Sequence, residues 1–155
     1  RKYRPRHYED RLRKAHALMP DAAFGADVMT GFPGETDAEF ADNVAFIDSL
    51  PFTYLHVFTY SERPGTPAAE RWPSVPMPVR KDRNRILREL AQRKNLAFRQ
   101  SLVNQTISAI TLDGGAGALS SNFVRIALTT AAEPRKIVNV HVDSVTHDQV
   151  IARIL

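Results

Sequence analysis

Two stretches of the chain constrain the fold most, because each combines an apolar strand with a loop rich in glycine and proline. The first strand is expected over residues 24–30 and continues into Gly-Phe-Pro-Gly-Glu-Thr at residues 31–36. The second is expected over residues 54–60 and continues into Ser-Glu-Arg-Pro-Gly at residues 61–65. Loops that follow parallel strands meet at one edge of a sheet, where α/β proteins build their sites.

A helix is expected between these two strands. Thr36 and Glu39 form a T-x-x-E capping box, and the helix should end near Leu50 because Pro51 follows it. Another helix is expected over residues 6–19, where apolar side chains recur at spacings of three and four. Strands joined by a helix of this length lie parallel, and two strands alone do not make a stable parallel sheet. We therefore expect this half to be part of a larger barrel or sheet.

The region after the second strand changes character twice. Five prolines between residues 61 and 78 predict an irregular connection without helix or strand. Pro78 suits the first turn of a helix. The spacing of Val79, Arg83, Ile86 and Leu90 then predicts a long amphipathic helix to about residue 101, basic on its outer face.

The last third of the chain is rich in β-branched residues and turn signals. Four short strands are expected over residues 105–112, 122–129, 136–142 and 149–155, forming a small antiparallel barrel. The predicted fold class is thus α/β, the last strands and helices of a parallel barrel, followed by a small all-β barrel. The expected boundaries are residues 1–77 for the α/β part, 78–102 for the linking helix and 103–155 for the small barrel.

Charge is unevenly distributed along the chain. Residues 1–14 carry seven Lys or Arg against two Asp or Glu, residues 15–79 carry two against nine, and residues 80–99 carry eight against two. Basic stretches of this kind suit a polyanion such as RNA, because phosphate contacts supply affinity that does not depend on sequence. The alternative is that both stretches are solvated helix faces.

Composition excludes several classes of site. The chain has no cysteine, so disulfides and thiolate metal sites are excluded. The five histidines show no ligand spacing, so neither a metal site nor a catalytic residue is predicted. His56 alternates with Tyr54 and Phe58, which favours a buried, hydrogen-bonded histidine. No apolar run is long enough to cross a bilayer, and we expect a cytoplasmic protein.

The first loop alone does not define a ligand. It lacks the lysine of a P-loop and does not match G-x-G-x-x-G, so simple nucleotide triphosphate binding is disfavoured. A glycine-rich turn before a helix can present backbone N–H groups to a ligand. It can also be a tight turn whose glycines have only a geometric use, and Glu35 can serve to cap the helix.

The two loops together resemble those of the radical S-adenosylmethionine methylthiotransferases that modify tRNA. The matching motifs are D-x-x-x-G-F-P-G-E-T, which begins at Asp27, and Y-S-x-R-x-G-T-x-A, which begins at Tyr60. The form Leu-His-Val-Phe at residues 55–58 looks most like the branch that acts on threonylcarbamoyladenosine at tRNA position 37. The tail resembles the TRAM domain that ends these enzymes, through residues 120–125, although no compact G-R-T is present.

The resemblance implies cofactors and site residues. The parent enzyme would use S-adenosylmethionine and 4Fe-4S clusters, whose cysteine ligands are absent from this chain. The residues expected near S-adenosylmethionine are Asp27, Gly31, Pro33, Gly34, Glu35, Tyr60, Ser61 and Arg63. The candidate RNA contacts are Arg80, Lys81, Arg85, Arg88 and Arg125.

The chain is accordingly expected to be a catalytically inert fragment of such an enzyme. Its partners would be tRNA and the missing N-terminal part, and the fragment could also associate with a second copy of itself. The alternatives are a stand-alone RNA-binding module and a structural fragment with no binding activity.

Overall fold

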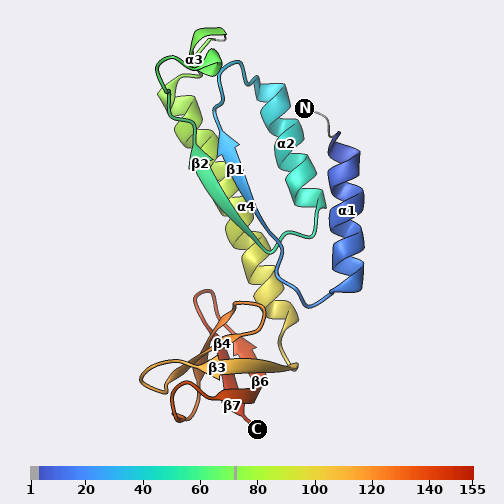
Figure 1. Cartoon of the computed structure of the whole chain (residues 1–155), viewed down its shortest axis with the longest axis vertical. Coiled ribbons are helices and arrows are strands. Elements are labelled where there is room, and N and C mark those ends of the chain that lie inside the picture. Colours follow the sequence, from blue (N-terminus) through green and yellow to red (C-terminus); the bar gives the residue numbers. More distant parts are fainter. Residues whose placement is uncertain (1–3, 72) are drawn as a thin grey trace. The chain divides into compact units, whose positions relative to one another are not determined.

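The computed structural model describes residues 4–71 and 73–155, and it divides the chain into two compact units, residues 1–94 and 95–155. The helix α4 (Met77–Ser101) contributes residues to both units. Figure 1 shows the order of the elements along the chain. Each unit is described by itself.

The first unit contains a two-stranded parallel sheet formed by β1 (Gly25–Thr30) and β2 (Tyr54–Thr59). The two strands pair in register from Gly25 opposite Tyr54 to Thr30 opposite Thr59. The helix α2 (Asp37–Ser49) connects them, and α1 (Pro5–Leu18) precedes β1. The sequence predicted all four elements to within about one residue at either end. Among the described residues, the outer edge of each strand has no partner strand.

The core of the first unit lies between the sheet and two helices. Val28 of β1, Phe40 and Ile47 of α2, and Leu87 and Leu90 of α4 are buried together. Val28 lies on the same face of the sheet as Ala26 and Thr30, whereas α1 contributes no fully buried residue. The sheet is therefore covered on one face only.

The start of α2 follows the sequence prediction in detail. The Thr36 side chain accepts a hydrogen bond from the Glu39 backbone N–H at 3.2 Å, and the Glu39 carboxylate accepts one from the Thr36 N–H at 2.9 Å. This reciprocal pair is the predicted capping box, and it fixes the point at which the first loop becomes helix.

The connection after β2 differs from its prediction. A short helix, α3 (Pro67–Arg71), lies within residues 61–78, which were expected to contain neither helix nor strand. The prediction failed because proline is well tolerated in the first turn of a helix, and Pro67 occupies that position.

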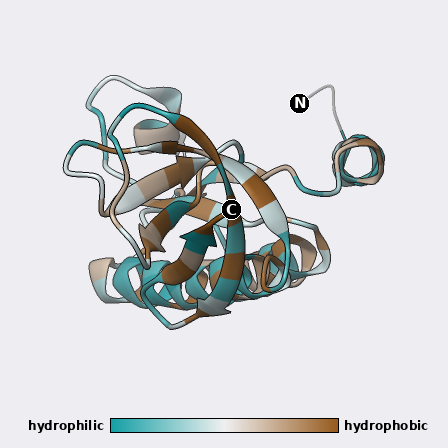
Figure 2. Ribbon diagram, turned by 90° about the horizontal axis from the view of Figure 1, so that it is seen from below, coloured by the Kyte–Doolittle hydropathy of each residue, from teal (hydrophilic) through white to brown (hydrophobic). Residues whose placement is uncertain are grey.

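The second unit is a closed barrel of five strands, in the order β3-β4-β5-β7-β6. Figure 2 shows hydrophobic stretches alternating with hydrophilic ones along these strands. The buried residues include Ala118, Val140, Val142, Val150 and Ala152, each with no exposed surface. The strand bounds are Thr106–Thr111 for β3, Gly117–Ser120 for β4, Arg125–Leu128 for β5, Ile137–Val145 for β6 and Val150–Ile154 for β7.

Two features of this barrel correct the prediction. No strand was expected over β4, which has only four residues and follows a glycine-rich turn, so four strands were expected instead of five. The pairing of β5 with β7 is parallel, whereas every other pair in the barrel is antiparallel. The parallel pair closes the barrel, so each of the five strands has a neighbour on both sides.

No helix among the residues that the structure describes is both long enough and apolar enough to cross a membrane.

Candidate functional site

Two loops meet at the carboxyl edge of the parallel sheet in the first unit. We call residues 31–36, after β1, the first loop and residues 60–66, after β2, the second loop. The Tyr60 N–H donates to the Thr30 carbonyl at 2.9 Å, which continues the pairing of the strands into the loops. The rings of Phe32 and Tyr60 lie 5.3 Å apart, edge to face. The parallel register thus places the two predicted motifs side by side.

Three backbone N–H groups of the first loop form hydrogen bonds within the protein. Gly31 and Gly34 have φ values of 73° and 82°, in the left-handed region that favours glycine. The Gly31 N–H donates to the Glu35 carboxylate at 2.8 Å, and the Glu35 N–H donates to the Phe32 carbonyl at 2.9 Å. The Gly34 N–H donates to the Pro73 carbonyl at 3.0 Å. These three donors are satisfied within the protein and are therefore not free to bind a ligand.

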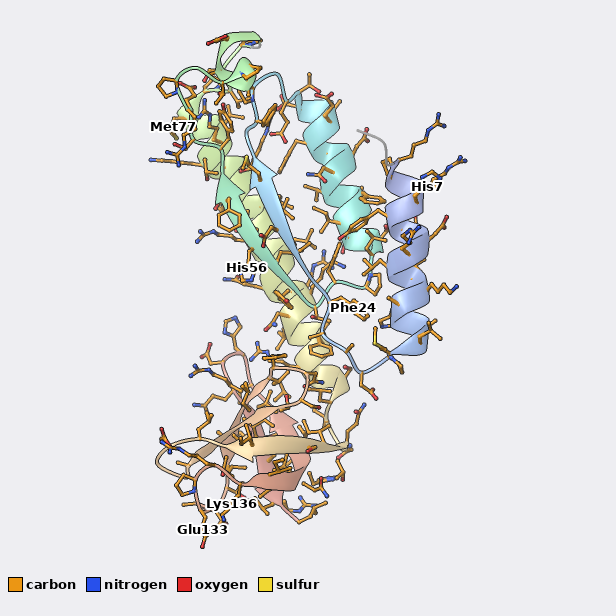
Figure 3. All side chains as sticks on the ribbon, viewed as in Figure 1. His7, Phe24, His56, Met77, Glu133 and Lys136 are labelled. Atoms are coloured by element: carbon orange, nitrogen blue, oxygen red, sulfur yellow. The ribbon has the colours of Figure 1, made fainter. Side chains whose placement is uncertain are left out.

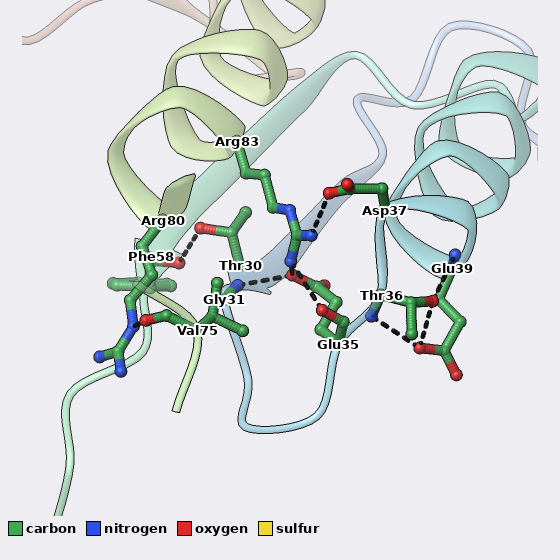
Figure 4. A network of polar contacts seen from close by, with 10 residues as sticks. All are labelled: Thr30, Gly31, Glu35, Thr36, Asp37, Glu39, Phe58, Val75, Arg80 and Arg83. Carbon is green, nitrogen blue, oxygen red and sulfur yellow. Dashed lines mark hydrogen bonds and ion pairs between the residues drawn. The ribbon is translucent and has the colours of Figure 1, made fainter. Parts of the chain in front are cut away.

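Arg83 of α4 binds Glu35 of the first loop and Asp37 at the start of α2 (Figure 4). Its Nη1 lies 2.6 Å from the Glu35 carboxylate and 3.1 Å from the Glu35 carbonyl, while its Nη2 lies 2.6 Å from the Asp37 carboxylate. The guanidinium also lies over the Phe40 ring at 5.2 Å. Burial opposes the charge and lowers the pKa of Arg83, but the hydrogen bonds to Asp37 and Glu35 raise this pKa overall. Glu35 therefore joins the loop to α4, and Thr36 rather than Glu35 caps α2.

Arg80, one helical turn earlier, contacts both loops. A Cβ atom added to Gly31 would lie 2.5 Å from the Arg80 Cγ, so the arginine stem packs directly on the first loop. Its Nη1 donates to the Tyr60 carbonyl at 3.1 Å, and its Nε donates to the Val75 carbonyl at 2.6 Å. Arg80 thus holds the second loop against the first.

This position corrects one candidate RNA contact. Arg80 is only 4% exposed, and its Nη2 donates to the Glu62 carboxylate, at 2.8 Å, and to the Ser74 hydroxyl. The hydrogen bond from Ser74, and then that from Arg80, lower the pKa of Glu62. Because its guanidinium is enclosed by protein acceptors, Arg80 is not available to a phosphate in this structure.

The predicted cofactor residues border two different clefts. Asp27 is exposed and lines a cleft of about 580 Å³ together with Met29, Phe32 and Phe52. Tyr60 and Ser61 line another cleft, of about 610 Å³, beside Arg80. Pro33 is buried, Gly34 and Glu35 are partly buried, and Arg63 is exposed. The structure therefore brings the loop backbones together, but Asp27 lies at one cleft and Tyr60 and Ser61 lie at the other, while the remaining predicted residues line neither of these two clefts.

His56 was expected to be buried, and that prediction is wrong. It lies on the uncovered face of the sheet together with Tyr54, Phe58 and Met29, all of which are exposed. Figure 3 shows His56 beside β2. The regular alternation along β2 was assigned correctly, but the sequence did not reveal which of the two faces is covered.

The other basic candidates are exposed. On α4, Lys81, Arg85 and Arg88 all face solvent, and Arg85 pairs with Asp82 and Glu89 at 2.8 Å each. Arg88 lines a cleft of about 380 Å³ with His56 and Phe58. Arg125 is exposed on β5 of the second unit. No cluster of three or more potential metal ligands occurs among residues 4–71 and 73–155.

The loop contacts of Arg80 and Arg83 were missed by sequence reasoning. Their spacing with Leu87 and Leu90 was the available signal, since all four fall on one side of a helix and all four are buried. Arg80 was assigned to an RNA contact, and Arg83 was placed on the apolar side of the helix without a partner, although charged side chains are rarely buried unless they are paired.

No family model matches the chain. The chain is 39% identical to tRNA-2-methylthio-N(6)-dimethylallyladenosine synthase of Wolbachia pipientis subsp. Culex pipiens over 104 residues. These residues make up 67% of this chain and 23% of that protein. It is 41% identical over 103 residues to the protein of the same name from Coxiella burnetii, covering 66% and 24%.

A relative with a different name matches over more of the chain. Threonylcarbamoyladenosine tRNA methylthiotransferase MtaB of Aquifex aeolicus is 31% identical over 140 residues, which cover 90% of this chain and 34% of that protein. The matches thus span about a quarter to a third of the length of these relatives. The homologues of this chain are tRNA methylthiotransferases, as its two loop motifs indicated.

Proposed function

We propose that the chain is a fragment of a tRNA methylthiotransferase that supplies one side of the S-adenosylmethionine pocket and part of the tRNA-binding surface. The observation that carries this proposal is the similarity to methylthiotransferases over 66–90% of the chain. The adjoining loops of the parallel sheet support it, because parallel α/β folds bind ligands beyond the carboxyl ends of their strands. By itself the fragment is proposed to be catalytically inert.

The substrate branch is a finer part of the proposal. We favour threonylcarbamoyladenosine at position 37 of tRNA, because Leu-His-Val-Phe at residues 55–58 resembles that branch. The relatives carry the names of both branches, with 31% identity to the threonylcarbamoyladenosine enzyme and 39–41% identity to the dimethylallyladenosine enzymes. Substitution of residues 55–58 in a relative would test whether this strand influences the choice of adenosine.

The iron–sulfur clusters of the proposed parent do not fit this chain. It has no cysteine, and the described residues contain no group of side chains suited to a metal.

Several side chains of this chain have polar groups that suit S-adenosylmethionine. The exposed Asp27 carboxylate can accept hydrogen bonds from a ribose or an amine, and the exposed Arg63 guanidinium can pair with a carboxylate. The Tyr60 hydroxyl is buried and has no hydrogen-bond partner among the residues described, although a buried hydroxyl normally has one. The bound cofactor would supply the group-transfer chemistry, while this chain would orient it and exclude water.

The proposed tRNA contacts are Lys81, Arg85 and Arg88 on α4 and Arg125 on β5. All four are exposed, and Arg88 lies beside the aromatic residues of the uncovered sheet face. Contacts of this kind add affinity by releasing counterions from the phosphates. The proposed location of the protein is the cytoplasm, where its tRNA partner would be found.

Two titrations test the proposal. We expect tRNA binding to weaken linearly on log–log axes as salt rises, and we expect S-adenosylmethionine to produce a calorimetric signal that Asp27→Asn weakens. Asp21→Asn, at an exposed aspartate outside both loops, is the matched control. Absence of any S-adenosylmethionine signal would contradict the cofactor part.

The second candidate is a stand-alone RNA-binding module, which the exposed cations of α4 favour. Salt-dependent tRNA binding without any response to S-adenosylmethionine would favour this module. Flat fluorescence anisotropy with tRNA at low salt would contradict both candidates.

A further inference from the structure

One aromatic side chain of the second unit is highly exposed, at a residue with a left-handed backbone conformation. Phe123 is 82% exposed and lies at the tip of the hairpin between β4 and β5. Its φ is 62°, in the left-handed region that bulky side chains rarely adopt. Neither burial nor backbone preference therefore explains a phenylalanine at this position.

The hairpin tip holds Phe123 in a fixed geometry. The Ser120 N–H donates to the Val124 carbonyl at 3.0 Å, and the Val124 N–H donates to the Ser120 hydroxyl at 2.9 Å. The Phe123 N–H donates to the Ser120 carbonyl at 2.9 Å. Three residues thus connect the paired positions Ser120 and Val124, and the third of them is left-handed. Glycine is the usual residue there, so the turn presents an aromatic ring where a smaller residue would suffice.

A cation without a carboxylate partner lies two residues further along the chain. Arg125 is exposed on β5, opposite Leu119 of β4. The four acidic residues of the second unit are each paired with another side chain of that unit. These pairs are Asp113 with Arg135, Glu133 with Lys136, Asp143 with Arg153, and Asp148 with His147. Among the described residues, no carboxylate pairs with Arg125.

An exposed aromatic ring on a hydrogen-bonded turn, two residues from a cation that pairs with no carboxylate, has the chemistry of a contact for single-stranded nucleic acid. Bases stack on aromatic rings, and an adjacent guanidinium binds the phosphate backbone. We propose that Phe123 stacks on an unpaired base of an RNA loop while Arg125 contacts a neighbouring phosphate. This inference rests on the proposed function, since it assigns to the second unit a specific part in holding RNA.

The experiment compares two RNAs, a stem-loop and a duplex of the same stem that has no loop. We expect Phe123→Gly to lower the affinity for the stem-loop roughly fivefold or more and to leave duplex binding unchanged. Phe123→Tyr should retain stem-loop binding, because it keeps the ring. Arg125→Gln should weaken both RNAs and reduce the slope of the salt dependence by about one.

Thermal unfolding provides a second measurement. Because glycine tolerates the left-handed backbone, Phe123→Gly should not lower the melting temperature. Loss of binding with retained stability cannot be attributed to a damaged fold. Ile137→Ser is the matched control, since Ile137 is 80% exposed on β6 and lacks a ring.

Three results would overturn the inference. If Phe123→Gly binds the stem-loop as the original chain does while Arg125→Gln binds weakly, stacking is refuted and the proposed tRNA contact remains. If the original chain binds neither RNA, both the inference and the proposed tRNA contact are refuted. If sedimentation shows a dimer that Phe123→Gly dissociates, the ring contacts a second copy of the chain instead of RNA.

Discussion

The two units of this protein are stabilised in different ways. In the second unit every strand has two neighbours, and the buried interior is composed largely of small aliphatic side chains. In the first unit the sheet has two strands with an open edge on each side, and one of its faces is exposed. The closed barrel completes its own hydrogen bonding, whereas the first unit depends on the helices packed against its sheet.

Long cationic side chains of α4 form many of the hydrogen bonds that join this helix to the two loops and to α2. Arg80 reaches the second loop, Arg83 reaches the first loop and Asp37, and Lys94 donates to the carbonyls of Asp48 and Leu50 at 2.7 Å each. Lys94 thus supplies donors at the C-terminus of α2, where helical carbonyls have no partner within the helix, and the Leu50 carbonyl also accepts from the Phe52 N–H at 2.8 Å. The contrast shows that α4 belongs to the structure of the proposed site and is more than a connection between two domains.

The largest expected effect comes from a cavity in the core of the first unit. Leu87 has no exposed surface, so Leu87→Ala should cost about 3 kcal/mol of unfolding free energy. Hydrogen exchange should show loss of protection in β1 and β2 and retained protection in β3 and β6. Val140→Ala, at an equally buried barrel position, should give the reverse pattern. Equal loss in both units after either change would refute the contrast.

A smaller effect is expected from the buried ion pair behind the first loop. Arg83→Met keeps the apolar stem but leaves the Glu35 carboxylate, whose side chain is 14% exposed, without its cation. We expect a loss of about 2–3 kcal/mol, because a largely buried charge is left unpaired. Urea denaturation followed by the NMR signals of β1 would measure this loss. Arg85→Met, which removes two exposed ion pairs from the same helix, should change stability by less than about 1 kcal/mol.

The local pattern of the first unit could be predicted from its sequence, because short-range rules determine it. Thr36 and Glu39 predicted the start of α2, and Pro51 predicted its end. The partners of Arg80 and Arg83 could not be predicted, because they include carboxylates 18 and 48 residues away, Glu62 and Glu35. A charged residue on an apolar stripe is recognised as buried only when its partner is known.

The sequence also did not reveal which face of the parallel sheet is covered, or which strands complete the barrel. The exposure of His56 depends on which face of the sheet α2 and α4 cover, and strand alternation is the same in either case. The strand β4 is too short to show a period of its own, and it is defined by pairing with β3 and β5. At the candidate site, the motifs predicted which loops meet. They did not predict that the N–H groups of Gly31, Gly34 and Glu35 are already bonded within the protein.

The smallest expected effect is a dependence of the first unit's stability on acid. Hydrogen bonds from Ser74 and then Arg80 lower the pKa of Glu62 below its ordinary value of 4.5, and the bond from Arg93 lowers the pKa of Asp48 below 3.8. A carboxyl whose pKa is lower in the folded state stabilises the fold above its unfolded-state pKa. This contribution is lost as the pH falls through the folded-state value. We therefore expect the urea midpoint of the first unit to decline below about pH 4.5, with only a modest slope because both carboxylates are exposed. Glu62→Gln combined with Asp48→Asn should flatten the decline, and an unchanged slope in that double variant would show that these pairs do not contribute to the difference between the units.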